Sequence, residues 1–117
     1  INAAKEWGAE LFVSCHANSV ADQTKSYSMC YFRNDTLSKT LASAVSKAAA
    51  TTIGISDSGG KEGVGLGEVS SNRTWPAIII EPMFVSNPSD CQKFSTAGGA
   101  AVGRAMANAI LSNIPKP

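Results

Sequence analysis

The stretch PAIIIE, residues 76–81, decides the fold, because three consecutive isoleucines between a proline and a glutamate are typical of a fully buried strand. A second short and β-prone stretch, ELFVSC at residues 10–15, is also apolar on successive positions and precedes His16, the only histidine of the chain. YSMCYF at residues 27–32 is a third strand candidate. The first two stretches predict strands that are covered on both faces of a sheet.

Helical stretches alternate with these strands. The clearest begins at Asp35 or Thr36, which are cap-type residues, carries apolar residues at helical spacing and stops at Gly54. Three others follow the same rules: the last turns of a helix over residues 1–8, a helix from Asn87 and Pro88, and a closing helix after Gly98 and Gly99 that Pro115 ends.

Residues 54–74, rich in glycine and serine, predict a surface loop with one short strand near residues 66–69. Strands that alternate with helices predict an α/β fold, with a mostly parallel sheet and helices on both faces. The length of 117 residues suits one domain, and neither a linker nor an internal repeat divides it.

The composition narrows the class of protein. An apolar fraction of 44% with 16% charged residues is typical of a globular chain, and a net charge of +1 without a basic cluster argues against nucleic acid as a partner. The longest strongly apolar stretch is too short to cross a bilayer. Cys15, Cys30 and Cys91 lack any metal-binding spacing, and we expect buried free thiols, although a disulfide stays open.

Two ionisable residues stand where the buried strands end. His16 follows residues 10–15 and Glu81 ends residues 76–81, so parallel neighbouring strands would place both in one crevice. Burial would raise the pKa of the carboxyl group toward that of a general base, and a neutral imidazole is a common zinc ligand. Metal-assisted hydrolysis is the chemistry that fits. The alternatives are a structural histidine, and a Glu81 that pairs with Lys61 or Arg73.

Other polar residues have simpler interpretations. A thiol nucleophile at Cys15 with His16 as its base is disfavoured, because adjacent residues of a strand point to opposite faces. Glu62 and Glu68 are expected to keep the glycine-rich loop solvated, with substrate contact as the alternative.

The stretches WGAELFVSCHANS (residues 7–19) and WPAIIIEPMFVSNPSD (residues 75–90) resemble two segments of the zinc-dependent N-acetylmuramoyl-L-alanine amidases, which include bacterial autolysins and phage endolysins. The glycine-rich residues 58–76 fall where that family has a loop before its later strand. The resemblance runs over essentially the whole chain.

The resemblance implies that His16 is a zinc ligand and Glu81 the catalytic carboxylate. The implied reaction cleaves the amide between N-acetylmuramic acid and L-alanine in peptidoglycan with zinc-activated water, and the substrate-binding residues are unknown. Family members also have a first histidine ligand after a Gly-His-Gly strand and a glutamate ligand on the next helix. Because neither is present here, we expect two further ligands for one Zn²⁺ ion upstream of Ile1.

The chain is therefore identified as the carboxyl-terminal part of such a domain, lacking its first strand and helix. We expect it to associate with that missing amino-terminal segment or with itself, and to act outside the cytoplasm on a cell wall, as a secreted autolysin or a phage enzyme. The alternative function is a non-catalytic wall-binding or regulatory module on the same scaffold. The bacterial or phage origin, the preferred stem peptide and any wall-anchoring domain stay open.

Overall fold

The computed structural model of the chain describes residues 1–70 and 74–116. Along the chain the elements are α1 (Asn2–Trp7), β1 (Phe12–Cys15), β2 (Ser28–Phe32), α2 (Thr36–Ile53), β3 (Asp57–Glu62), the 3-10 helix η1 (Gly67–Val69), β4 (Ala77–Glu81), α3 (Pro88–Ala97) and α4 (Gly99–Asn113). No helix within these two ranges is long and apolar enough to span a membrane.

The four strands form one sheet in the order β1-β4-β2-β3. β1 runs parallel to β4 and β2 runs parallel to β3, whereas β2 and β4 are antiparallel. The mostly parallel α/β sheet predicted from the sequence is confirmed. β1 and β2 lie on either side of β4 and run in opposite directions, because residues 16–27 connect them as a loop without a crossover helix. Since β1 is parallel to β4, β2 is antiparallel to it.

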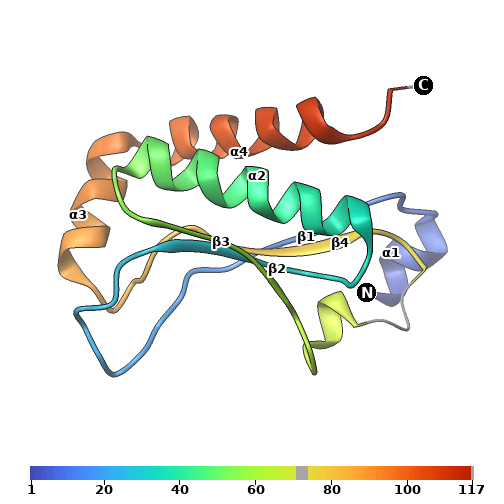
Figure 1. Cartoon of the computed structure of the whole chain (residues 1–117), viewed down its shortest axis with the longest axis horizontal. Helices are drawn as coiled ribbons and strands as arrows, with labels where there is room; N and C mark the ends of the chain where they lie inside the picture. The colour runs from blue at the N-terminus through green and yellow to red at the C-terminus, as the bar shows by residue number, and fades with distance from the viewer. Residues whose placement is uncertain (71–73, 117) are drawn as a thin grey trace.

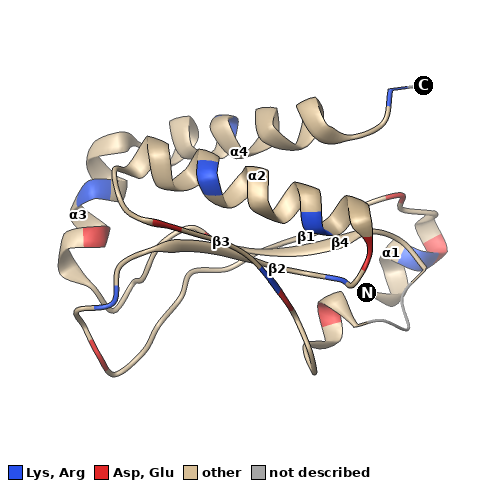
Figure 2. Cartoon of the chain, in the orientation of Figure 1, with Lys and Arg blue, Asp and Glu red and all other residues tan. Residues whose placement is uncertain are grey.

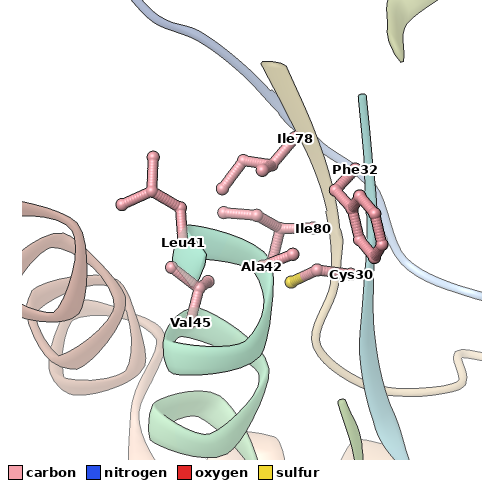
Figure 3. Packing of buried hydrophobic residues seen from close by; sticks show 7 residues of the cluster. All are labelled: Cys30, Phe32, Leu41, Ala42, Val45, Ile78 and Ile80. Carbon is pink, nitrogen blue, oxygen red and sulfur yellow. The ribbon is translucent and has the colours of Figure 1, made fainter. Parts of the chain in front are cut away.

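Helices α2 and α4 lie side by side along one face of the sheet, and α3 lies at one end (Figure 1). The core between α2 and the sheet contains buried apolar side chains from α2, β2 and β4: Cys30, Phe32, Leu41, Ala42, Val45, Ile78 and Ile80 (Figure 3). The opposite face carries η1, whose buried Val69 packs with Trp75, Ala77 and Ile79. The isoleucine run of β4 is therefore covered on both sides, as the sequence predicts.

Helix ends follow the predicted signals. Asp35 is the N-cap of α2 and accepts a hydrogen bond from the Ser38 amide, while Gly54 ends the helix at a left-handed φ of 80°. Burial raises the pKa of Asp35, but hydrogen bonds from Ser38 and Arg33 outweigh it, so the net pKa lies below its usual value. Asn87 caps α3 in the same way and Pro88 is its first residue.

Two predictions about strands were wrong. Residues 57–62, expected to be loop, form β3, because backbone pairing with β2 supplies hydrogen bonds that a glycine-rich sequence does not signal. Residues 67–69 form a 3-10 helix instead of a strand. β1 is also less buried than expected, because it lies at the edge of the sheet and one of its faces is only partly covered.

Charges and thiols are spread over the molecule. Basic and acidic segments occur on helices, strands and loops without gathering on one element (Figure 2). The three cysteines are free, but only Cys30 is buried, since Cys15 is exposed and Cys91 is partly exposed. Burial raises the pKa of Cys30 to about 12.

Candidate active site

The two strands that end in polar residues are hydrogen-bonded parallel neighbours. Cys15 of β1 pairs with Ile80 of β4, and the His16 amide donates to the Ile80 carbonyl at 2.9 Å. His16 and Glu81 each follow that pair by one residue, so they lie side by side at the carboxyl ends of their strands. The predicted juxtaposition of the two residues is confirmed.

Both residues lie on the face of the sheet opposite α2. Strand residues alternate between faces, and Ile78 and Ile80 pack against α2. Ile79 instead packs on the other side with Val69, and Glu81 shares its face. On β1, Ser14 and His16 are two residues apart and share that face too. Polar side chains from two strands therefore converge beneath η1.

The backbone beyond the two strands is held in place, which fixes the direction in which the site residues leave the sheet. The Asn18 amide donates to the Met83 carbonyl at 2.9 Å, and the Val85 amide donates to the Asn18 carbonyl at 2.8 Å. The turn after Glu81 is anchored by the fully buried Asp90, whose carboxylate accepts from the Phe84 amide at 3.0 Å. A buried carboxylate with these partners is structural.

His16 is in contact with two polar side chains. Its Nε2 atom lies 3.0 Å from Ser14 Oγ and 3.3 Å from Glu68 Oε1. The Ser14 hydroxyl also donates to Glu68 Oε1, so the three side chains form a closed triangle. The side chains of His16 and Glu68 are 47% and 33% exposed. A histidine this exposed and with these polar contacts is not a core residue.

Glu68 therefore belongs to the site, and the expectation that it merely solvates a loop was wrong. The hydrogen bond from Ser14 is the main reason that the pKa of Glu68 lies below its usual value; burial opposes it, and His16 adds to it. Ser14 could have been found in the sequence, because residues two apart in a strand share a face. Glu68 could not, since its position depends on the path of the chain through β3 and η1.

Glu81 is in a different environment from Glu68. Burial raises its pKa, and the nearby His16 lowers it by less. In the described part of the chain Glu81 forms no ion pair with Lys61. The other suggested partner, Arg73, lies outside the described residues. Glu81 is thus a partly buried carboxyl group whose proton affinity is increased, as the sequence predicts for a general base.

A depression next to the site could receive part of a substrate. It has a volume of about 340 Å³ and is lined by Tyr31, Lys61, Glu62, Gly63, Val64 and Leu66. Tyr31 connects it to the site, because Tyr31 pairs with Ile79 of β4 and packs on the face of the sheet that carries η1. Burial, and then the negative charge of Glu81, raise the pKa of Tyr31. Glu62 lines this depression and does not contact His16.

The thiol alternative is excluded by the same geometry. Cys15 pairs with Ile80, whose side chain lies in the core beneath α2, so the thiol is on the opposite face of the sheet from the His16 imidazole. The two adjacent side chains diverge as predicted, and they do not form a nucleophile and base.

The site contains side-chain atoms of the kinds that bind zinc. An imidazole nitrogen and a carboxylate oxygen are both ordinary zinc ligands, and His16 and Glu68 present one of each from neighbouring positions. Among residues 1–70 and 74–116, however, no group of three or more histidine, cysteine, aspartate or glutamate side chains is arranged to hold a metal. The described residues therefore fit part of a zinc site, and further ligands would have to come from elsewhere.

Comparisons with known proteins agree with this geometry. The family model described as N-acetylmuramoyl-L-alanine amidase matches residues 1–112. No curated protein sequence matches the chain. Several solved structures do.

The catalytic domain of CwlV, an N-acetylmuramoyl-L-alanine amidase from Bacillus (Paenibacillus) polymyxa var. colistinus, is 26% identical with a TM-score of 0.80. The alignment covers 96% of this chain and 62% of that one. An N-acetylmuramoyl-L-alanine amidase from Clostridium difficile 630 is 27% identical with a TM-score of 0.77, over 95% of this chain and 61% of that one. The present chain thus spans somewhat under two thirds of the length of these proteins.

The catalytic domain of the CD27L endolysin, which targets Clostridium difficile, has the same fold, with 17% identity and a TM-score of 0.78. That alignment covers 98% of this chain and 66% of the endolysin domain.

Proposed function

The chain belongs to the N-acetylmuramoyl-L-alanine amidase family, and on this premise we propose that it takes part in hydrolysing the amide between N-acetylmuramic acid and L-alanine in peptidoglycan. The observation that carries the proposal is the pairing of His16 with Glu81 at the carboxyl ends of β1 and β4. An imidazole that can hold a metal and a carboxyl group that can move a proton are the parts that such a hydrolysis requires.

We infer that the site takes one zinc ion, with Nε2 of His16 as a ligand. When bound, zinc polarises the carbonyl of the scissile amide and lowers the pKa of a water molecule. Catalytic zinc usually has three protein ligands, and the described residues do not supply all of them. We propose that polypeptide outside the described residues, or a second molecule, contributes the rest.

The role proposed for Glu81 is proton transfer. Its carboxylate would accept a proton from the attacking water and then donate it to the nitrogen of the departing amine. The increase of its pKa by burial supports this role, because the group then holds a proton more readily than an exposed glutamate does. Glu81 is only partly buried, at the end of β4, so part of its side chain is exposed to solvent.

A substrate of this kind implies where the protein acts. Peptidoglycan lies outside the cytoplasmic membrane, so we propose an extracytoplasmic site of action at a cell wall, reached by secretion or by delivery from a phage. The depression beside Tyr31 is proposed to receive part of the stem peptide.

A second candidate function is a wall-binding or regulatory module without catalysis. The absence of a third metal-binding side chain from the described residues favours it. Retention of both His16 and Glu81 in the arrangement that hydrolysis needs argues against it.

Glu81→Gln separates these two functions, because glutamine keeps the shape of the side chain but cannot accept the proton. Glu10→Gln is the matched control, since Glu10 is exposed and precedes β1 at the opposite end of that strand from His16. We expect Glu81→Gln to lower the rate of amine release from purified peptidoglycan by about 100-fold or more, Glu10→Gln to leave it unchanged, and a chelator to abolish it reversibly. Wall binding with no amine release by the wild-type protein would support the module instead.

A further inference from the structure

The face of the sheet that carries Glu81 also carries Lys61, whose ammonium group has neither an ion pair nor a hydrogen bond within residues 1–70 and 74–116. We propose that Lys61, together with the hydroxyl of Tyr31, binds a free carboxylate on the second residue of the stem peptide. The chain would then prefer peptidoglycan in which this carboxylate is not amidated. This inference rests on the proposed function, which places the amide of L-alanine at Glu81.

Backbone pairing connects Lys61 to the strand of Glu81. Tyr31 of β2 pairs with Ile79 of β4 on one side and with Lys61 of β3 on the other, so these three residues form a row across the sheet. Glu81 lies two residues beyond Ile79 on β4, and residues two apart in a strand share a face. Tyr31 therefore lies between the strand of the catalytic carboxylate and the strand of the lysine.

The Lys61 side chain lies on the same face as Glu81. Its neighbour Gly60 faces the helices, because a Cβ atom on Gly60 would lie 3.2 Å from the Cβ atom of Ala42 in α2. Adjacent residues of a strand point to opposite faces, so Lys61 points away from the helices. Tyr31 packs on that same face. The ammonium and phenol groups are thus on the side of the sheet where the reaction is proposed to occur.

Both groups can donate hydrogen bonds into the depression beside the site. Tyr31 and Lys61 line this depression, whose volume is about 340 Å³. The ammonium has three N–H donors, and the phenol keeps its proton because burial, and then the charge of Glu81, raise the pKa of Tyr31. Glu62 also lines the depression, but as the residue next to Lys61 it leaves the strand on the opposite face. A depression with these donors fits an anionic group of the substrate.

The spacing between Glu81 and Lys61 indicates which part of the substrate meets the ammonium. Strands about 4.8 Å apart put β3 about 10 Å from β4, because β2 lies between them, and two residues along a strand add about 7 Å. The Cα atoms of Glu81 and Lys61 are therefore about 12 Å apart. The two side chains extend over the same face, which leaves a span of about one or two residues of extended peptide. With L-alanine at Glu81, the group at Lys61 belongs to the second stem residue.

The chemistry of that residue determines how well it is bound. Its carboxylate can be free or amidated, and only the free form is charged. A carboxylate accepts charge-assisted hydrogen bonds from an ammonium group, which are roughly twice as strong as bonds between neutral groups. An amide at the same position loses this attraction and brings N–H donors toward the donors of Lys61 and Tyr31.

The test measures binding and does not depend on hydrolysis. Two synthetic peptides are titrated into the isotope-labelled protein and followed by its amide NMR signals: L-alanyl-γ-D-glutamyl-L-lysine, and the same peptide with D-isoglutamine as its second residue. Both are products of the proposed reaction, so the protein cannot cleave them by it. Lys61→Gln removes the charge, and Tyr31→Phe removes the hydroxyl. Lys39→Gln is the matched control, since Lys39 is an exposed lysine on α2, beyond the other face of the sheet.

We expect the wild-type protein to bind the peptide with the free carboxylate about threefold to tenfold more tightly than the amidated peptide. Lys61→Gln should abolish this preference, Tyr31→Phe should reduce it, and Lys39→Gln should leave it unchanged. Added salt should weaken the preference of the wild-type protein, because the proposed contact is between charges at an exposed site.

Equal affinity of the wild-type protein for the two peptides, a preference that persists in Lys61→Gln, or binding of neither peptide would overturn the assignment. None of these results would decide whether the protein cleaves the amide, which release of amine from peptidoglycan tests separately. Unchanged circular dichroism of Lys61→Gln, where the side chain is exposed, confirms that the variant is folded.

Discussion

A buried serine in α2 should contribute more to stability than its size suggests. Ser38 is fully buried, and its hydroxyl donates to the carboxylate of Asp35 at 2.6 Å while accepting from the Ala77 amide at 2.8 Å. The Asp35 carboxylate also caps α2. One hydroxyl therefore connects the first turn of the long helix to the first residue of β4, the strand that ends in Glu81.

Ser38→Ala leaves the buried Ala77 amide without its acceptor. An orphaned buried donor costs about 1–3 kcal/mol, whereas the helix preference for alanine over serine returns about 0.5 kcal/mol. The net loss should be about 0.5–2.5 kcal/mol. Because Asp35 keeps the hydrogen bonds from the Ser38 amide and from Arg33, the cap itself survives.

Urea unfolding followed by circular dichroism measures this loss. With a urea dependence of about 1.5 kcal/mol per molar, the midpoint should fall by about 1 M. Ser43→Ala is the matched control in the same helix, since Ser43 is exposed and its hydroxyl donates to the Lys39 carbonyl of its own helix. The midpoint of this control should stay or rise slightly. A Ser38→Ala midpoint equal to that of Ser43→Ala would refute the reasoning.

Three other predictions concern the core, the helix cap and the thiols. Leu41→Ala should lower the free energy of unfolding by about 2–5 kcal/mol, because Leu41 is fully buried. The control Leu111→Ala, whose side chain is 62% exposed, should change it by at most about 0.5 kcal/mol. Equal losses in urea unfolding for the two variants would contradict this prediction. The pKa of Asp35 is lower in the folded than in the unfolded chain, so its stabilisation is complete above the unfolded value of about 4 and is lost as pH falls through the lowered folded value. Asp35→Asn should therefore be less stable than the wild type at pH 7, with a difference that shrinks toward pH 2; a difference independent of pH would count against the assignment. In a thiol titration of the folded protein at pH 8, the exposed Cys15 should react within minutes. Cys30, whose pKa burial raises to about 12, should react only when the protein unfolds. Rapid labelling of Cys30 would contradict this prediction, because it would show that the core opens.

The elements that could be predicted from the sequence are those whose signals are local. The isoleucine run of β4 needs cover on both faces wherever it lies, and Asp35 and Gly54 mark the ends of α2 through the conformations of those residues alone. β3 could not be predicted in this way, because its glycines have no preference for strand and the segment is extended only by pairing with β2.

The same distinction between local and long-range signals applies to the residues of the candidate site. His16 and Glu81 could be identified because each directly follows or ends an apolar strand, and parallel strands bring their carboxyl ends together. Glu68 reaches the site through β3 and η1, which are positioned by contacts distant in the sequence. The number of residues between His16 and Glu68 in the sequence therefore does not predict that their side chains are in contact.

The central claim is that the protein cleaves the amide between N-acetylmuramic acid and L-alanine. Identifying the bond that is broken in peptidoglycan is its most direct test. Peptidoglycan digested with the wild-type protein should be separated and its products identified by mass spectrometry. The account predicts free stem peptides that begin with an L-alanine amino group, together with glycan strands whose muramic acid carries an unsubstituted lactyl carboxylate. Shortened glycan strands with new reducing ends, or stem peptides cut only within their own sequence, would contradict it.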